Sequence, residues 1–102
     1  MFKNKRYLTA GIDASLPFPT QLLLWKMIDD MPEPKDYLQV FQLSKEIVDG
    51  KPVQKVHHKQ EMPNHQEVAH LGIIPTHDIK NGKIFVIDDG DHSTMLWAHE
   101  YL

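Results

Sequence analysis

The chain has 102 residues, of which 41% are hydrophobic and 25% charged, a formal net charge of −3 and no cysteine. This is the length of one domain, so we expect residues 1–102 to fold as a single unit. The absence of cysteine excludes disulfides and thiolate catalysis and favours a reducing cytoplasm. The mildly acidic charge does not favour a general nucleic-acid binder. No apolar run is long enough to span a bilayer, so we expect no membrane partner.

The N-terminal third predicts one strand followed by one helix. Residues 5–12, KRYLTAGI, are rich in strand-forming side chains and predict the first strand. Residues 20–31, TQLLLWKMIDDM, predict the principal helix, capped by Thr20 and ended by Pro32. Its expected core stripe recurs at helical spacing and consists of Leu24, Met27, Ile28 and Met31.

Large apolar residues of this helix also lie outside the core stripe. Leu22 and Trp25 are three residues apart, on the flank of the stripe. Tryptophan is enriched among the hot spots of protein interfaces, so the pair predicts a surface that binds a protein partner. The alternative is that the helix is buried around most of its circumference.

The middle of the chain predicts a hairpin. Asp49-Gly50 is a strong signal for a two-residue turn. That turn places Val48 opposite Lys51, Leu43 opposite Val56 and Phe41 opposite His58.

The next segment, residues 63–73, reads PNHQEVAHLGI and predicts a short helix. Asn64 is its expected N-cap, and Glu67 stands three residues later, as in a capping box. A loop or an irregular strand is the alternative for this segment.

The last third predicts a three-stranded meander over residues 75–80, 83–88 and 91–98. Its expected turns are the dipeptides Asn81-Gly82 and Asp89-Gly90, which accept positive φ at low cost.

The stretch VIDDGDHSTM, residues 86–95, holds the densest group of chemically active side chains. A two-residue turn at Asp89-Gly90 places Asp88 opposite Asp91 and Ile87 opposite His92. Aspartate is common in turns because its carboxylate accepts hydrogen bonds from nearby backbone N–H groups. Two facing carboxylates repel, however, so we expect solvent, a lysine, a shared proton or a cation to offset their charge. A shared proton or a divalent ion would make a polar site of Asp88, Asp91 and His92, and a tip that binds a partner is the remaining alternative.

The seven histidines raise the question of a metal. His65 and His70 are five residues apart and do not share one helical face, so they do not match the zinc-protease motif. A site assembled from remote segments stays open, but the sequence assigns no metal, cofactor or catalytic residue. Three basic residues lie near the start of the chain, at Lys3, Lys5 and Arg6. They keep a nucleic-acid contact as a minor alternative.

Five stretches together carry a family resemblance. They are NKRYLTAGI, LLLWKMIDDM, DYLQVFQL, HHKQEMP and KIFVIDDGDHSTMLWAHEY. They resemble domain of unknown function 960, a family of small proteins from Gram-positive bacteria and their mobile elements, over nearly the whole chain. The resemblance implies a cytoplasmic protein with a mobile-element context, and it brings no activity or site residues.

We therefore expect an α+β fold with a mainly antiparallel sheet of five or six strands. One principal helix should pack on one face, with a second short helix as an option. We expect a non-enzymatic accessory factor that binds a protein partner, or that pairs with a second copy through a hydrophobic sheet edge. A His/Asp metal-dependent enzyme and a nucleic-acid accessory protein are the alternatives.

Overall fold

The computed structural model describes residues 1–101, and their elements form one sheet with helices attached. The strands are β1 (Lys5–Leu8), β2 (Leu38–Val48), β3 (Lys51–Gln60), β4 (His65–Leu71), β5 (Gly82–Asp88) and β6 (His92–Trp97). The helices are α1 (Ala10–Ser15), α2 (Phe18–Asp29) and the 3₁₀ turns η1 (Thr76–Asp78) and η2 (Ala98–Glu100).

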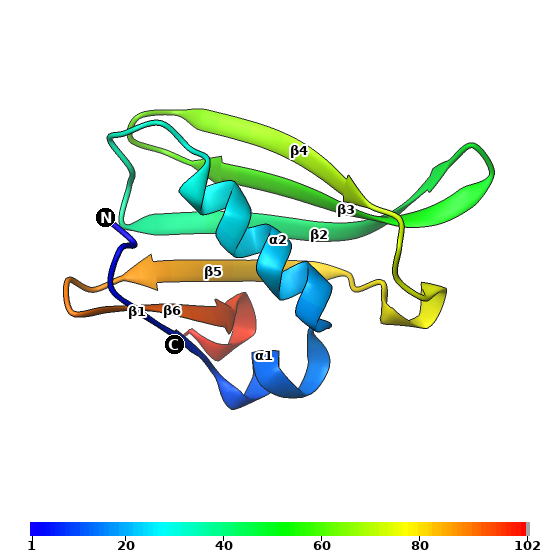
Figure 1. Ribbon diagram of the computed structural model, residues 1–102, viewed down its shortest axis with the longest axis horizontal. Coiled ribbons are helices and arrows are strands. Elements are labelled where there is room, and N and C mark those ends of the chain that lie inside the picture. Colours follow the sequence, from blue (N-terminus) through cyan, green and yellow to red (C-terminus); the bar gives the residue numbers. More distant parts are fainter. Residues whose placement is uncertain (102) are drawn as a thin grey trace.

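The six strands form a mixed sheet in the order β1-β6-β5-β2-β3-β4. All neighbours are antiparallel except β1 and β6, which run parallel. Helix α2 lies across one face of this sheet, as Figure 1 shows. The expected α+β class, with a mostly antiparallel sheet and one main helix, is confirmed. No helix within residues 1–101 is both long and apolar enough to cross a membrane.

The core lies between α2 and the sheet. All four residues of the expected stripe are buried: Leu24, Met27, Ile28 and Met31. Leu24, Met27 and Ile28 share one core cluster with alternate side chains of the central strands, among them Phe41, Leu43, Val56, Ile84, Val86 and Met95. The helical period of α2 and the two-residue period of the strands therefore meet in one apolar layer.

The N-terminal elements differ from the predicted strand and helix in their bounds. The first strand ends at Leu8, because the Thr9 side chain accepts a hydrogen bond from the Ile12 N–H and begins α1. Helix α2 starts at Phe18, and Thr20 is buried inside its first turn, not at its cap. Pro19 is tolerated there because the first N–H groups of a helix have no partner within it.

The hairpin of β2 and β3 is confirmed in its expected register. Val48 pairs with Lys51, Leu43 with Val56 and Phe41 with His58. Both turn residues have positive φ, +50° at Asp49 and +78° at Gly50, as a two-residue turn of this kind requires.

The prediction of a helix around residues 64–72 is wrong. The segment is the edge strand β4, which pairs with β3 along its length, from Gln54 opposite Leu71 to Gln60 opposite His65. Only Ala69 packs against the core from this strand. The capping pattern is a local signal, and backbone pairing with β3 outweighs it here.

Of the expected three-stranded meander, only the hairpin of β5 and β6 forms. Residues 76–78 form the turn η1 instead of a strand, and Gly82 begins β5 opposite Leu43 instead of closing a two-residue turn. In the hairpin that remains, Asp88 pairs with Ser93, not with Asp91. The register therefore differs by two residues, which keeps every side chain on its expected face.

Candidate functional site

The exposed side of α2 carries large apolar side chains near its start. Phe18 is 66% exposed and Leu22 is 52% exposed, and the two lie one helical turn apart. Pro19, also exposed, adjoins them. We call Phe18, Pro19 and Leu22 the α2 outer surface. The opposite side of the helix is buried against the sheet, so this apolar surface has no structural role in the core.

Trp25, the other candidate residue of the helix, has a different environment. It is half-buried and packs at the edge of the core. The Arg6 guanidinium carbon lies 4.6 Å from the centre of the Trp25 ring, close enough for a cation–π contact. Asp29 fixes this arginine through two hydrogen bonds, one of them 3.2 Å long. Leu22 is therefore the more exposed of the two, whereas one face of Trp25 is already covered.

An open depression adjoins the α2 outer surface. It has a volume of about 440 Å³, and its lining includes Phe18, Pro19, Asp13 and Asp78. Asp13 has no ion pair within the part of the chain that the structure describes, and Asp78 has only His77, at 3.6 Å. Apolar side chains and carboxylates thus share one surface.

The acidic stretch is organised around two aspartates with different partners. Asp88 is buried and accepts hydrogen bonds from the Phe2 N–H at 2.6 Å, the Gly90 N–H at 2.8 Å and the Asn4 side chain at 3.0 Å. Burial by itself raises the pKa of Asp88, but these hydrogen bonds outweigh it and lower the pKa below its ordinary value. The carboxylate therefore anchors the start of the chain to the end of β5.

The other residues of the acidic stretch do not converge with Asp88. Asp89 accepts hydrogen bonds from the N–H groups of Asp91 and His92, both at 3.1 Å, and so closes the turn. Its second oxygen lies 3.1 Å from His92 Nε2. Asp91 is exposed, and the His92 ring meets Tyr7 edge-on at 5.2 Å. Among residues 1–101, no group of three or more His, Asp or Glu side chains is placed to hold a metal.

One histidine is fully buried. His58 stacks on Phe41 with ring centres 4.2 Å apart, and its Nε2 lies 2.6 Å from Gln39 Oε1. The Gln39 amide nitrogen donates to Gln60 Oε1 at 2.7 Å, so its oxygen is the acceptor and His58 Nε2 carries the proton. Burial, and then the nearby His65 and His57, lower the pKa of His58 to about 4.

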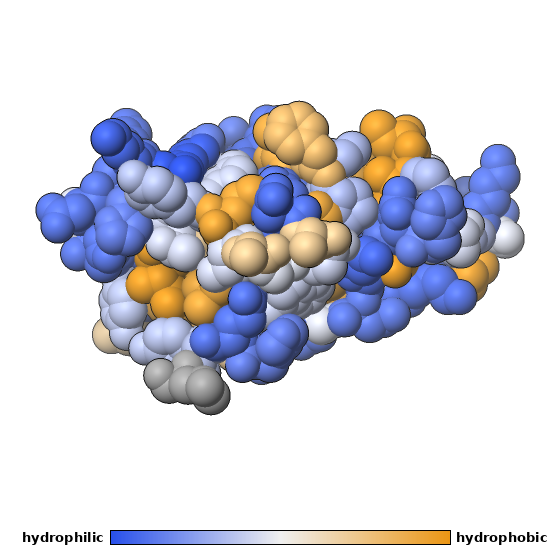
Figure 2. All heavy atoms as spheres, turned by 90° about the horizontal axis from the view of Figure 1, so that it is seen from below, coloured by the Kyte–Doolittle hydropathy of each residue, from blue (hydrophilic) through white to orange (hydrophobic). Residues whose placement is uncertain are grey.

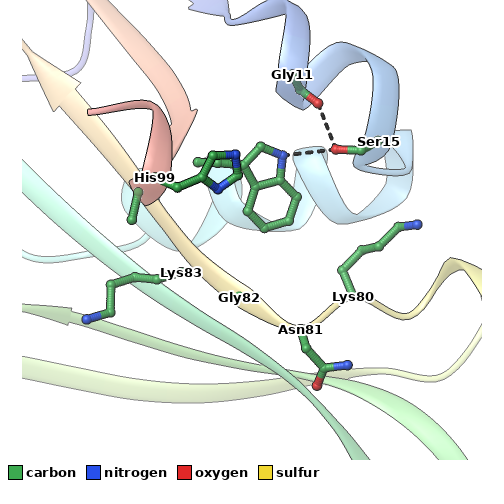
Figure 3. Close-up of a pocket in the computed structure, with 9 residues that line it drawn as sticks. Gly11, Ser15, Lys80, Asn81, Gly82, Lys83 and His99 are labelled. Atoms are coloured by element: carbon green, nitrogen blue, oxygen red, sulfur yellow. Dashed lines mark hydrogen bonds between the residues drawn. The ribbon is translucent and has the colours of Figure 1, made fainter. Parts of the chain in front are cut away.

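A second hollow, which no sequence pattern predicts, lies where β5 begins, at the end of the strand opposite Asp88. It has a volume of about 600 Å³ and is lined by Gly11, Ser15, Lys80, Asn81, Gly82, Lys83, Trp97, Ala98 and His99. In Figure 3, Gly11 and Ser15 of α1 lie on one side and the Lys80–Lys83 segment lies on the other. The Trp97 indole contacts both sides, with its N–H 2.9 Å from Ser15 Oγ and its ring next to Gly82. Three remote segments build this cavity, so no local motif marks it.

The hydrophobic surface is divided rather than continuous on the side of β1, β6 and α1. Figure 2, seen from this side, shows separate hydrophobic patches among hydrophilic residues. Hydrophobic residues scattered in this way are normal on the surface of a folded protein.

Comparisons with known proteins agree with the family resemblance. A crystal structure of a protein of unknown function from Enterococcus faecalis is 28% identical and superposes with a TM-score of 0.77. The match covers 97% of this chain and 92% of that chain. The search of curated proteins found no match. The model of a family described as staphylococcal protein of unknown function, DUF960, matches residues 5–100, and the chain therefore belongs to that family.

Proposed function

We propose that the protein acts by binding a protein partner, without catalysis, through the α2 outer surface. The observation that carries this proposal is the exposure of Phe18 and Leu22 on a helix whose other side is fully used by the core. Large apolar side chains are costly to leave in water, and they contribute strongly when a partner covers them.

The depression beside this surface indicates the chemistry of the partner. Asp13 and Asp78 border the apolar residues, so a lysine or arginine next to apolar side chains would meet complementary charge. We therefore propose a partner segment that is apolar with a flanking basic residue. A cytoplasmic location, for which the cysteine-free sequence is suited, and a mobile-element context, which rests on the family resemblance, are part of the same proposal.

The test begins with a photo-crosslinking amino acid at position 22 in the native bacterium. The same group at position 51, on the hairpin tip remote from α2, is the control. We expect an adduct with another protein at position 22 and none at position 51. An adduct between two copies of this chain would replace the partner proposal with a homodimer, and no adduct at position 22 would refute it.

The crosslinked partner is then purified, and its affinity is measured for two variants. Leu22→Asp removes an apolar contact, whereas Lys51→Asp introduces the same side chain at the exposed tip of the β2–β3 hairpin. We expect Leu22→Asp to weaken binding by about 30-fold, the effect of losing an interface hot spot of roughly 2 kcal/mol. The proposal is wrong if Leu22→Asp binds as tightly as Lys51→Asp.

Asp13→Asn tests the charge complementarity separately. We expect it to slow association and to reduce the salt dependence of the association rate, because the flanking charge acts mainly during encounter. An association rate that is equally sensitive to salt with and without Asp13 would remove the basic residue from the description of the partner.

A further inference from the structure

The sheet has a second face, which points away from α2. Side chains alternate along a strand, and the buried residues Phe41, Val56 and Ile84 point toward α2 and the core. The residues between them therefore lie on the other face, where strand pairing arranges them in rows across the sheet. We call this surface the open sheet face, and its exposed or half-buried residues include Lys5, Tyr7, Val40, Lys59, Lys83 and Phe85.

The charged residues of the strands are divided unequally between the two faces. Lysines of β1, β3 and β5 lie on the open sheet face: Lys5, Lys51, Lys55, Lys59 and Lys83. Within the six described strands, Glu46 supplies the only carboxylate on this face, and it lies 4.0 Å from Lys55. Glu67 and Asp88 lie on the α2 side. The face is therefore basic, although the chain has a formal net charge of −3.

Three of these lysines are available to bind an anion. Lys5, Lys59 and Lys83 are exposed, and none of them has an ion pair within residues 1–101. Lys83 is two residues from Phe85 along β5, and Lys59 lies in the same row as Phe85, with Val40 of β2 between them. The usual spacings in a sheet make these separations about 7 Å and about 10 Å. The ammonium groups thus border the apolar centre of the face.

Aromatic rings adjoin these lysines. Tyr7 is two residues from Lys5 along β1 and is 49% exposed, and its ring meets that of His92 edge-on. Phe85 meets the exposed Tyr101 edge-on, with ring centres 5.9 Å apart. Neither pair is stacked face to face, so flat ring surface stays available. Such surface accepts any base by stacking, because every base has a flat π-face.

A depression opens at one end of the open sheet face. It has a volume of about 300 Å³, and its lining combines Val40 of the face with the exposed Tyr37 and Met62. Asp36 and Glu61 also border it. Carboxylates repel phosphate but accept hydrogen bonds from the amino groups of bases, so this end suits a base.

We propose that the open sheet face binds single-stranded nucleic acid. The bases lie against the aromatic and apolar side chains, and the phosphates lie beside Lys5, Lys59 and Lys83. A single strand exposes its bases, whereas a duplex stacks them inside and offers only its backbone to a flat surface. The open sheet face lies on the opposite side of the sheet from α2, so this proposal does not depend on the protein partner.

The probe is a fluorescent oligothymidine of about 15 nucleotides, and its anisotropy is followed during titration with the whole protein in about 50 mM salt. We expect a dissociation constant of about 10 μM or lower. An abasic strand of the same length presents phosphates without bases, and a duplex presents stacked bases, so both should bind more weakly. Oligouridine compares RNA with DNA, and tighter binding of either single strand supports the proposal.

The lysines are tested by the salt dependence of binding. Lys59→Gln/Lys83→Gln removes two phosphate contacts, so we expect the slope of log affinity against log salt to become shallower by about 1.4. Lys26→Gln/Lys45→Gln removes the same charge from exposed lysines on the α2 side and should leave the slope unchanged. Equal slopes for the two double variants would overturn the proposal.

The aromatic surface is tested with Tyr7→Ala, which should weaken binding of oligothymidine by about fivefold or more. Phe18→Ala removes a similarly exposed ring from the α2 outer surface and should have no effect. The proposal is overturned by equal losses in these two variants, by equal binding of the abasic strand or the duplex, or by no binding at about 100 μM protein. A dimer in light scattering that Tyr7→Ala dissociates would assign the face to a second copy and also overturn it.

Discussion

Acidification should destabilise the protein through one buried side chain, His58. The folded protein keeps this imidazole neutral, because burial lowers the pKa of His58 from 6.5 to about 4. In the unfolded chain the same group takes up a proton near its ordinary value. Between these two pH values the unfolded state binds more protons than the folded state, so stability falls as the pH falls.

The size of this effect follows from the interval between the two pKa values. Each pH unit corresponds to about 1.36 kcal/mol, so the interval from 6.5 to about 4 corresponds to about 3 kcal/mol. The contribution of His58 should be fully present above pH 6.5 and lost progressively down to about pH 4. A loss of this size is a large part of the stability of a small domain.

The assay is the free energy of unfolding, measured in urea at several pH values between 4 and 7. His58→Phe keeps an aromatic ring against Phe41 but cannot take up a proton. It also leaves Gln39 Oε1 without its donor, so we expect a loss of about 1–3 kcal/mol at pH 7. Between pH 6.5 and 4, however, its free energy of unfolding should fall by about 3 kcal/mol less than that of the wild type.

A second core variant separates the pH effect from general weakening. Val56→Ala truncates a fully buried neighbour on the same strand and should cost about 2 kcal/mol at every pH. Its curve should run parallel to that of the wild type. Parallel curves for His58→Phe and the wild type would refute the reasoning, because His58 would then titrate alike in the folded and unfolded states.

Three further predictions concern the core, the acidic stretch and the hairpin turn, and each is measured by urea unfolding. Leu24→Ala should cost about 3 kcal/mol because Leu24 is fully buried, whereas Leu22→Ala should cost less than about 0.5 kcal/mol; similar costs would contradict the packing of α2. Asp88→Asn should cost about 2 kcal/mol at pH 7 by weakening charged hydrogen bonds to Phe2 and Gly90, and an equal loss from Asp91→Asn would disprove the anchoring role. Gly50→Ala should cost about 1 kcal/mol because φ is +78° with open space around the residue, and no loss would mean that the turn relaxes.

The part of the fold that sequence patterns predicted depends on contacts between residues close in the chain. The turn at Asp49-Gly50 needs only its two residues, and its register then follows along β2 and β3. The core stripe of α2 follows from the helical period alone. Both signals are local, so neighbouring residues carry enough information to specify them.

The errors arose where pairing with another segment decided the local conformation. The segment from Asn64 carries a capping pattern, yet pairing with the preceding strand β3 makes residues 65–71 a strand. The hairpin register at Asp88 differs from the expected one, and its carboxylate binds Phe2, which is 86 positions away in the chain. A turn dipeptide sets only a local preference, and several hydrogen bonds to a buried carboxylate can outweigh it.

By itself, the sequence determined the α+β class, the main helix with its buried stripe and the first hairpin, because each depends on the spacing of side chains along a short segment. Only the tertiary structure decided that Leu22 is exposed while Arg6 covers Trp25, that β1 joins the sheet in parallel to β6, and that Lys59, Lys83 and Phe85 share one face of the sheet. These features join segments that lie far apart in the chain. Their geometry depends on how the whole core packs, and no short pattern of residues encodes it.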